Sequence, residues 1–538
     1  MSSTIDGSAS AALGPLFAFL SYALIQAESV FYKIPGSYVI DRYIKSHQND
    51  RGRTVLEILL ALFAIRILLQ VQSRTRSDKG EKDFIHFSEK EVDKLVDEWT
   101  PEPLGAPLSP EEQSDLASVC VVSGANGPRP KLANTGKQVL NLTSYNFTGL
   151  AGNEVIKVRA IETLRKYGVG CCGAPGHYGT TDVHVALERD IADFLGTETS
   201  ILNSQGFSTI PSVISAFAKR GDIIVADRGI NFAIQKGLQI SRSTVRWFDH
   251  NDLKSLEDVL LSVEKDRQRR RESLTRRFIV TEGIFEKDGA IVDLPKLIEL
   301  KHKYKYRLIL DESISFGSVG RTGRGLTELY NIPATQIDMI VGSVANGLNS
   351  SGGFCAGSRV IVDHQRCNGT SFVFSAAIPA LLAASASEGI NILRNTPSIL
   401  STLQENVRAI RAVLDRVAAI TIPSHAASPI IHIHLHSAAT LSAPTSASVK
   451  PPDPAIPASR NAPSFDIAGE ERLLQDIVDE ALAQGVWITR ARRLRGQELV
   501  EARPSIRLAV TAAMSRKECE RAAGVIKAGI VKVLTKRK

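Results

Sequence analysis

One stretch decides the fold of this chain: DMIVGSVANGLNSSGGF, residues 338–354. Met339 to Val341 is a short apolar run with the length and composition of a buried strand. The loop after it consists of small residues, and its glycines let the backbone approach a ligand or a neighbouring segment closely. An isolated loop of this kind is also compatible with a plain Gly/Ser-rich surface connection. The stretch therefore predicts a buried strand that runs into a ligand-facing loop or a surface loop.

The surrounding sequence predicts an α/β fold. Short Val/Ile-rich runs alternate with longer amphipathic segments from about residue 140 to residue 375, the pattern of a sheet covered by helices. A helix over 156–167 and an Ala/Leu-rich helix over 380–394 are expected. The predicted strands are Ser200–Leu202, Asp222–Ala226, Thr244–Trp247, Phe278–Thr281, Arg307–Leu310, Met339–Val341 and, further along, Ile430–Leu435.

Composition excludes several classes of protein. The chain is 43% hydrophobic and 23% charged, as in ordinary globular proteins, and its net charge of +8 is dispersed. The densest basic run, residues 265–277, contains acidic residues and no aromatic residue, so it indicates a solvated face and no nucleic-acid partner. The six cysteines lack Cys-x-x-Cys spacing and the density of a secreted scaffold, which favours reduced thiols facing the cytosol.

The N-terminal part predicts membrane association. Residues 1–53 form an amphipathic, interfacial region, in which 11–25 is apolar but lacks the basic leader of a signal peptide. Thr54–Val71, about 18 residues or roughly 27 Å as a helix, matches the thickness of the hydrocarbon layer and predicts one transmembrane helix. Because Glu57 and Arg66 lie inside it, a buried helix of the globular domain is the alternative.

Two further segments are predicted to be irregular. Residues 72–138 should form a connector, because closely spaced prolines after Trp99 favour an extended chain. Residues 437–463 are rich in Ser, Ala and Pro and are predicted to be a disordered loop.

Three histidines alternate at the end of the predicted strand Ile430–Leu435. His432, His434 and His436 would share one face, which is compatible with a metal site. No carboxylate or thiol lies nearby in the sequence, so we favour a half-exposed strand and predict no metal site.

Landmarks on both sides of the opening stretch resemble those of the α-oxoamine synthases. These fold-type I pyridoxal-phosphate enzymes condense an amino acid with an acyl thioester. The glycine-rich loop Gly168–Gly179, Ser204–Phe207 and Asp311–Ser315 occur here in the order of that family. The resemblance implies a large domain over 139–375, with a mostly parallel sheet covered by helices, and a smaller C-terminal α/β domain over 376–538. It also implies a dimer with the glycine-rich loop at the interface beside the active site.

The residues that carry the family's chemistry are changed. Asn346 stands where the family has the lysine that holds the cofactor as an imine, and an amide nitrogen cannot form one because its lone pair is delocalised. No lysine occurs between Tyr306 and Val449. By the same resemblance, Asn231 and Ile314 replace two histidines, whereas Asp311 keeps the carboxylate that would pair with the pyridinium nitrogen. The resemblance thus implies no catalytic residue in this chain and a vestigial role for Asp311.

Other positions are assigned by the resemblance to a partner's cofactor pocket. Cys172, Phe374 and Ser375 are expected to face it, since hydroxyl-bearing residues of this segment reach the neighbouring subunit's cofactor phosphate in dimeric relatives. Arg507 matches the arginine that binds the amino-acid carboxylate in active relatives. In a site that has lost its lysine we expect Arg507 to be structural.

The membrane segment, the Trp-Thr-Pro-Glu-Pro connector and the lysine-free loop together make the chain similar to the first, long-chain-base subunits of eukaryotic serine palmitoyltransferases. This implies a heterodimer in the endoplasmic reticulum membrane with its catalytic domain facing the cytosol. A lysine-bearing second subunit would bind pyridoxal 5'-phosphate covalently and join L-serine to palmitoyl-CoA, giving 3-ketosphinganine in the first step of sphingolipid biosynthesis. A small activating subunit and Orm-type regulators are further implied partners.

Two rival functions stay open at this point. The chain could be an independently active homodimeric acyltransferase whose cofactor is held by an unmatched lysine. It could also be a membrane-bound regulatory scaffold that shapes no active site.

Overall fold

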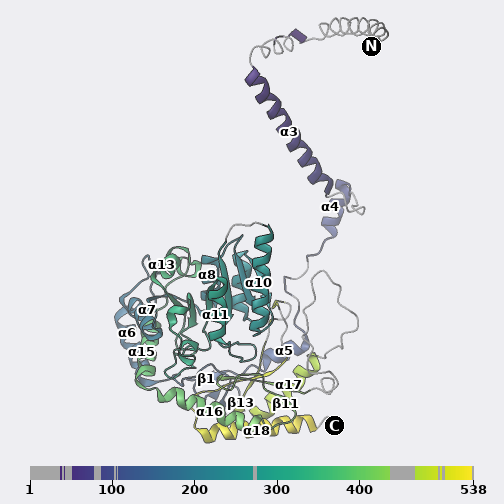
Figure 1. Cartoon of the computed structure of the whole chain (residues 1–538). Helices are drawn as coiled ribbons and strands as arrows, with labels where there is room; N and C mark the ends of the chain where they lie inside the picture. Colours follow the sequence, from purple (N-terminus) through teal and green to yellow (C-terminus); the bar gives the residue numbers. More distant parts are fainter. Residues whose placement is uncertain are drawn as a thin grey trace, which may run out of the picture. The chain divides into compact units, whose positions relative to one another are not determined.

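The computed structural model describes residues 37, 38, 42, 51–77, 87–101, 104, 105, 107–270, 275–436, 467–492, 494, 497–499 and 503–535 (Figure 1). Contacts divide the chain into two compact units, Met1–Glu112 and Gln113–Lys538. The predicted interfacial residues 11–25 and the predicted disordered loop 437–463 lie outside the described residues. The boundaries of the large and small domains, at 138/139 and 375/376, stay predictions.

Helix α3 (Arg51–Ser77) occupies the predicted membrane span over 54–71. Its described apolar side chains from Val55 to Leu69 are all exposed. Within the part of the chain that the structure describes, no helix has the length and apolar character needed to cross a membrane. The prediction of a transmembrane helix is therefore not supported; Glu57 and Arg66 interrupt the apolar run.

The predicted connector over 72–138 contains regular structure. Ser88 donates its backbone N–H to Glu91 at 2.8 Å, and Ser109 does the same to Glu112 at 2.8 Å. Each pair is a capping box, and the Ser-x-x-Glu spacing in the sequence is the signal for it. The sequence analysis expected an extended chain near the prolines and did not predict these helices and strands. The elements are α4 (Glu89–Glu98), α5 (Pro110–Ala117) and the antiparallel strands β1 (Val122–Ser123) and β2 (Lys131–Leu132).

A seven-stranded mixed sheet lies at the centre of the second unit, in the order β4-β10-β9-β8-β7-β5-β6. The neighbours from β9 to β6 are parallel, whereas β10 runs antiparallel to both β9 and β4. All six strands predicted for this region are confirmed. They are β4 (Thr199–Asn203), β5 (Ile223–Asp227), β6 (Thr244–Phe248), β7 (Arg277–Glu282), β8 (Arg307–Asp311) and β9 (Met339–Ser343).

The sequence analysis missed β10 (Gly353–Gly357), which is buried along its whole length. It contains no β-branched residue, so it lacks the usual signature of a strand. Its small residues are required by packing, because a Cβ on Gly353 would collide with the Thr209 side chain on helix α8 (Gly206–Phe217). Gly353 thus lets helix α8 pack closely on this face of the sheet.

Helices cover the sheet, and α15 (Ala380–Asn395) packs against α6 (Glu154–Tyr167) and α7 (Asp182–Leu195). The two helices predicted at 156–167 and 380–394 are therefore present. The other helices of this region are α9 (Phe232–Ser241), α10 (Leu253–Arg270), α11 (Leu294–Tyr304), α12 (Leu326–Leu329), α13 (Arg359–Asn368) and α14 (Thr370–Val373), with the 3-10 turn η2 (Ala334–Gln336).

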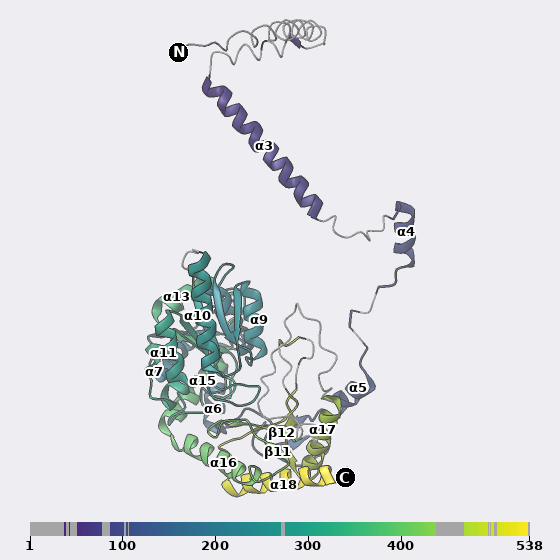
Figure 2. The ribbon, with the colours of Figure 1, turned by 45° about the vertical axis from the view of Figure 1, so that its right-hand side comes forward.

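A four-stranded sheet, in the order β11-β12-β15-β14, forms the C-terminal part. Helix α18 packs against α16 and α17 beside it (Figure 2). The strand predicted at Ile430–Leu435 is β12 with the same bounds. The parallel pair β3 (Leu140–Asn141) and β13 (Val486–Trp487) joins this part to the start of the core. The other elements are β11 (Ile420–Thr421), β14 (Thr489–Arg490), β15 (Ile506–Ala509), α16 (Ser398–Leu414), α17 (Ile467–Ala483) and α18 (Arg516–Thr535).

The histidines of β12 do not converge on one point. His432 is buried, where Ser505 and the Glu286 carbonyl contact its two ring nitrogens at 2.9 and 3.0 Å. His434 contacts the Pro504 carbonyl at 3.0 Å. The strand is mostly buried, so the prediction of a half-exposed strand was wrong. Within the described residues, no cluster of His, Cys, Asp and Glu side chains could hold a metal ion.

A histidine ties three strand ends together. His250, just after β6, contacts Asp227 at the end of β5 through Nδ1 at 2.8 Å and Asp288 through Nε2 at 3.0 Å. Burial alone would lower the pKa of His250, but the hydrogen bonds and charges of the two carboxylates raise it to about 10. The imidazolium form therefore holds these segments together across the neutral range.

The opening stretch itself is fixed by backbone packing. A Cβ on Gly347 would lie 2.8 Å from the Phe316 carbonyl oxygen and 2.9 Å from Gly317 Cα. The Thr148 hydroxyl donates to the Gly347 carbonyl at 2.6 Å. The loop after β9 is thus a packed, buried segment there, and the surface-loop alternative is wrong.

We expect the free energy of unfolding to fall as pH rises from about 6.5 to about 10 in the wild-type chain. The folded pKa of His250 lies above its unfolded value, so its stabilisation is complete below the unfolded pKa and is lost as pH rises through the folded pKa. Since 33% of the side chain is exposed, solvent screening makes the loss smaller than full linkage. Urea unfolding of wild type and His250→Gln across this range tests it, and equal pH slopes would contradict it.

We expect Gly347→Ala to destabilise the chain by about 1–3 kcal/mol, because the added methyl group must displace backbone atoms of another segment. Gly524→Ala is the matched control: Gly524 lies inside α18 with no atom within 4 Å of an added Cβ, so the substitution should be neutral or stabilising. Chemical denaturation of both variants measures the difference. Equal stability of the two variants would show that the loop yields to the methyl group.

Candidate functional site

The candidate site lies where parallel strands end. Strands β5, β7, β8 and β9 run parallel, and their carboxyl ends are Asp227, Glu282, Asp311 and Ser343. Glu282 and Asp311 stand opposite each other in the register of β7 and β8. In open α/β sheets the crevice outside these ends is the usual place for a ligand.

Asn231 joins the two carboxyl groups. Its backbone N–H donates to Glu282 Oε1 at 2.6 Å, and its side-chain Nδ2 donates to Asp311 Oδ2 at 3.1 Å. Its Oδ1 accepts from the Ile234 N–H at 3.0 Å, so the same side chain is the N-cap of α9. Both the nitrogen and the oxygen of the Asn231 side-chain amide therefore form hydrogen bonds within the protein.

Both carboxyl groups are buried and favour the neutral form. Burial raises the pKa of Glu282 well above its usual range, and the charges of Asp311 and Glu286 raise it further. Burial also raises the pKa of Asp311, which accepts hydrogen bonds from Ser313 and Asn231. A carboxyl group held neutral cannot act as the counter-charge of a cation.

A second chain of contacts extends from Glu286 to Arg507. The Tyr145 hydroxyl donates to Glu286 Oε1 at 3.2 Å and accepts from Arg507 Nη1 at 3.0 Å. The guanidinium also lies 4.8 Å from the centre of the Tyr145 ring and donates to the Thr143 carbonyl at 3.4 Å. These contacts agree with a structural role for Arg507. The sequence analysis gave Tyr145 no role, because nothing in the sequence placed it beside β15.

The Asn346 side chain is held by a hydrogen bond to a neighbouring turn. Its Nδ2 donates to the Ser313 carbonyl at 2.8 Å, which ties the loop after β9 to the turn after β8. Ile314, in that same turn, is buried in the hydrophobic core. The structure thus brings Asn231, Asp311, Asn346 and Ile314 to one edge of the sheet.

These residues do not fit pyridoxal phosphate. The position of the lysine carries an amide that is already bonded, and the carboxyl group expected to face a pyridinium nitrogen already accepts a hydrogen bond from Asn231. A cavity of about 170 Å³ at the same edge has one lysine in its lining, Lys287. Lys287 Nζ lies 2.8 Å from Glu498 Oε2, so its amine is paired with a carboxylate. Position in the sequence gave no signal for this lysine.

The residues assigned to a partner's pocket lie together on the surface. The loop Gly168–Gly179 packs against the segment after α14, where the Ala377 N–H donates to the Gly173 carbonyl at 2.9 Å and Cys171 Sγ contacts the Ile378 carbonyl at 3.3 Å. Phe374 is 84% exposed, and Cys172 is exposed with a φ of +52°. Ser375 is half-buried, with its hydroxyl 2.9 Å from that of Ser204.

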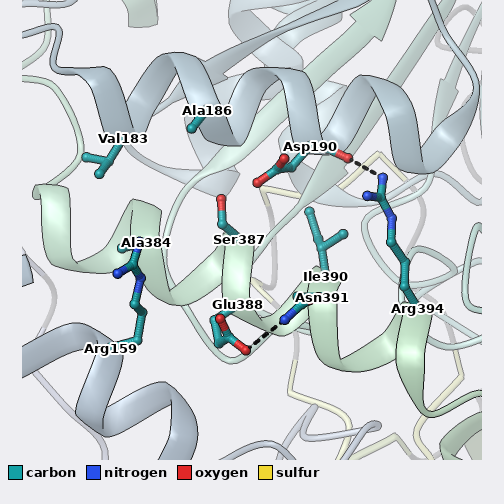
Figure 3. A pocket seen from close by; sticks show the side chains of 10 residues that line it. All are labelled: Arg159, Val183, Ala186, Asp190, Ala384, Ser387, Glu388, Ile390, Asn391 and Arg394. Carbon is teal, nitrogen blue, oxygen red and sulfur yellow. Dashed lines mark hydrogen bonds between the residues drawn. The ribbon is translucent and has the colours of Figure 1, made fainter.

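A different cavity, of about 280 Å³, lies among α6, α7 and α15 (Figure 3). Arg394 donates to the Asp190 carbonyl at 3.2 Å and Asn391 donates to Glu388 at 3.1 Å, as the dashed lines in Figure 3 show. It contains no lysine and none of the residues singled out from the sequence. We therefore place the candidate site at the carboxyl edge of the sheet and not in this cavity.

Comparison with known proteins identifies the family of this chain. Residues 137–526 match the family described as Aminotransferase class I and II. Long chain base biosynthesis protein 1b of Oryza sativa subsp. japonica is 45% identical over 349 residues, which cover 65% of this chain and 71% of that protein. Serine palmitoyltransferase 1 of Saccharomyces cerevisiae is 37% identical over 540 residues, which cover 96% of each protein.

The solved structure of Sphingomonas wittichii serine palmitoyltransferase superimposes with a TM-score of 0.66 at 21% identity, covering 84% of this chain and 100% of that chain. The predicted fold-type I α/β class is thereby confirmed, with a mixed sheet. Because the family match spans most of the chain and the yeast relative aligns along nearly all of it, this chain belongs to the aminotransferase class I and II family, in its serine palmitoyltransferase branch.

Proposed function

We propose that this chain is the non-catalytic subunit of a serine palmitoyltransferase. In the proposed complex, a lysine-bearing second subunit binds pyridoxal 5'-phosphate and joins L-serine to palmitoyl-CoA, giving 3-ketosphinganine. The observation that carries the proposal is Asn346, which is bonded to the Ser313 carbonyl where the family's chemistry needs an amine. This chain then stabilises and completes a pocket whose reacting groups belong to the partner.

The exposed apolar surface around the glycine-rich loop supports a partner there. Val169, Tyr178 and Phe374 are 74%, 92% and 84% exposed, and all three lie on the loop or on the segment after α14. Helix α6, which leads into the loop, exposes four more apolar side chains on its outer sides: Val155, Val158, Ile161 and Leu164. A monomer rarely exposes such a group of apolar side chains, whereas an interface buries them.

Within the complex, each part of this surface has a physical task. Phe374 would exclude water from the partner's pocket, since it is the large apolar side chain nearest the Ser375 hydroxyl in the sequence. The Ser375 hydroxyl would donate a hydrogen bond to an anionic group of the partner's cofactor. Cys172, held at a left-handed backbone angle beside this segment, would form the adjoining wall.

Membrane attachment is part of the proposal as well. Helix α3 exposes apolar side chains from Val55 to Leu69, which favour contact with lipid or with apolar helices of other subunits. We place the complex at the endoplasmic reticulum membrane with its catalytic domain facing the cytosol. A small activating subunit and Orm-type regulators are the proposed further partners.

We expect the chain purified alone to give no stoichiometric pyridoxyl adduct on a lysine of the candidate site when it is incubated with equimolar pyridoxal 5'-phosphate and reduced with borohydride. The reason is the absence of an unpaired lysine amine at the candidate site: Asn346 is an amide, and Lys287 is paired with Glu498. Mass spectrometry of the reduced chain checks this, with the lysine-bearing subunit as positive control. An adduct on Lys287 that disappears in Lys287→Arg would support the independent acyltransferase instead.

We expect Phe374→Ala to lower kcat/KM of the reconstituted complex about 10-fold, and Cys172→Ala and Ser375→Ala to lower it by smaller factors, because each shortens a wall of the shared pocket. Val531→Ala, at an exposed apolar side chain of α18, is the matched control and should leave turnover unchanged. Wild-type turnover in all three variants would favour the regulatory scaffold.

A further inference from the structure

Five serine residues connect α8 with the segment that carries Phe374. Ser208 and Ser212 lie four residues apart on α8, Ser204 lies just before the helix and four residues before Ser208, and Ser371 and Ser375 are also four residues apart. We call these five residues the serine ladder.

The contacts of the ladder are direct. The Ser204 and Ser375 hydroxyls lie 2.9 Å apart, and the Ser208 and Ser371 hydroxyls lie 2.8 Å apart. The Ser371 backbone N–H donates to the Ser212 hydroxyl at 3.1 Å. The spacing of four matches one helical turn, so the serines of α8 form one line along it.

The segment held by the ladder has little structure of its own. Helix α14 (Thr370–Val373) is a single turn, which is too short to be stable in isolation. Phe372 is its one buried side chain and anchors it beside Gly176 of the glycine-rich loop. Phe374, at the C-cap of α14, points away from the core and is 84% exposed. Phe372 and the partly buried Val373 are the apolar anchors of this turn, and polar contacts add directional restraints on its orientation.

We infer that Ser208, Ser212 and Ser371 are positioning residues, which set the orientation of α14 and thereby aim Phe374 and Ser375 at the pocket of the partner subunit. Ser204 contributes by holding the Ser375 hydroxyl. The inference rests on the proposed function, because it concerns what this chain presents to the lysine-bearing subunit. None of these serines needs to contact the substrate in order to act in this way.

The ladder explains a feature that packing alone does not. Ser208 and Ser371 are half-buried hydroxyls between two helices, where an apolar pair would pack without a preferred rotation. Hydrogen bonds are directional, so they fix both distance and angle. A misplacement of about 1 Å in a residue that shapes a pocket costs up to about 100-fold in rate.

The test compares Ser208→Ala, Ser371→Ala and the double variant with wild type. The matched control is Ser215→Ala, since Ser215 is also half-buried on α8 but its hydroxyl contacts only the Ser212 carbonyl of its own helix, at 3.2 Å. Ser208→Thr keeps a hydroxyl at the same position and should restore the wild-type behaviour. Each variant is examined as the full chain, alone and in complex with the lysine-bearing subunit.

In the chain alone, we expect amide hydrogen exchange over residues 369–376 to become about 10-fold faster in the double variant and to stay unchanged in Ser215→Ala. In the complex, we expect kcat/KM to fall about 10-fold in the double variant. The change in activation free energy of the double variant should be smaller than the sum of the changes in the two single variants, because both serines make the same contact. Subunit association should be unchanged, so that the loss appears in kcat and KM.

Unchanged exchange over 369–376 in the double variant would overturn the inference. Faster exchange together with wild-type turnover would also overturn it, since α14 would then be loosened without consequence for the pocket. Loss of subunit association in the double variant would also overturn the inference, because the ladder would then be a structural support of the interface. Failure of the proposed function is distinguishable from these results, because it appears as a wild-type complex that does not form or does not turn over.

Discussion

Two buried carboxyl groups at the ends of adjacent parallel strands set the main constraint on this structure. Glu282 and Asp311 face each other in register, away from water, and each must be satisfied by a donor inside the protein. Asn231 meets both needs at once, with its backbone N–H for one carboxyl group and its side-chain amide for the other. Because Asn231 also caps α9, the position of that helix depends on the same residue.

In this arrangement, internal hydrogen bonds hold the edge of the sheet at which open α/β folds usually bind a ligand. Burial raises the pKa of Asp311, and both of its oxygens accept hydrogen bonds from within the protein. The loop after β9 also adds internal contacts at this edge. The Asn346 side-chain amide donates to the Ser313 carbonyl, and Gly347 packs directly against the backbone near Phe316. The edge therefore gains internal contacts at the positions where relatives of this family bind their cofactor.

Much of the fold followed from the sequence, because Val/Ile-rich runs of the right length lie at β4 to β9 and at β12. Strand β10 did not follow, since Gly353–Gly357 is defined by the space between its neighbours and not by strand propensity. The Ser-x-x-Glu spacing of the capping boxes before α4 and α5 is present in the sequence, but the prediction of an extended connector rested on the prolines. In the site, Asn231, Asp311 and Asn346 were found because a resemblance fixed their order. Lys287, Tyr145 and the serine ladder depend on contacts between distant segments, which no local pattern encodes.

The three altered positions form one physical unit. Asp311 is buried here without the counter-charge that a bound pyridinium ring would supply, and such a group is costly until it is neutral or bonded. Asn231 supplies that bond to Asp311, and Ile314 fills core space in the turn that Asn346 ties down. Asn231 and Asn346 each use the side-chain amide for an internal hydrogen bond, so a lysine placed at 346 alone would leave Asp311 bonded to Asn231. Phe374 keeps an exposed aromatic ring, and the adjacent Ser375 keeps a hydroxyl beside Ser204, just before α8. This separate surface is the one that the chain can present to a partner.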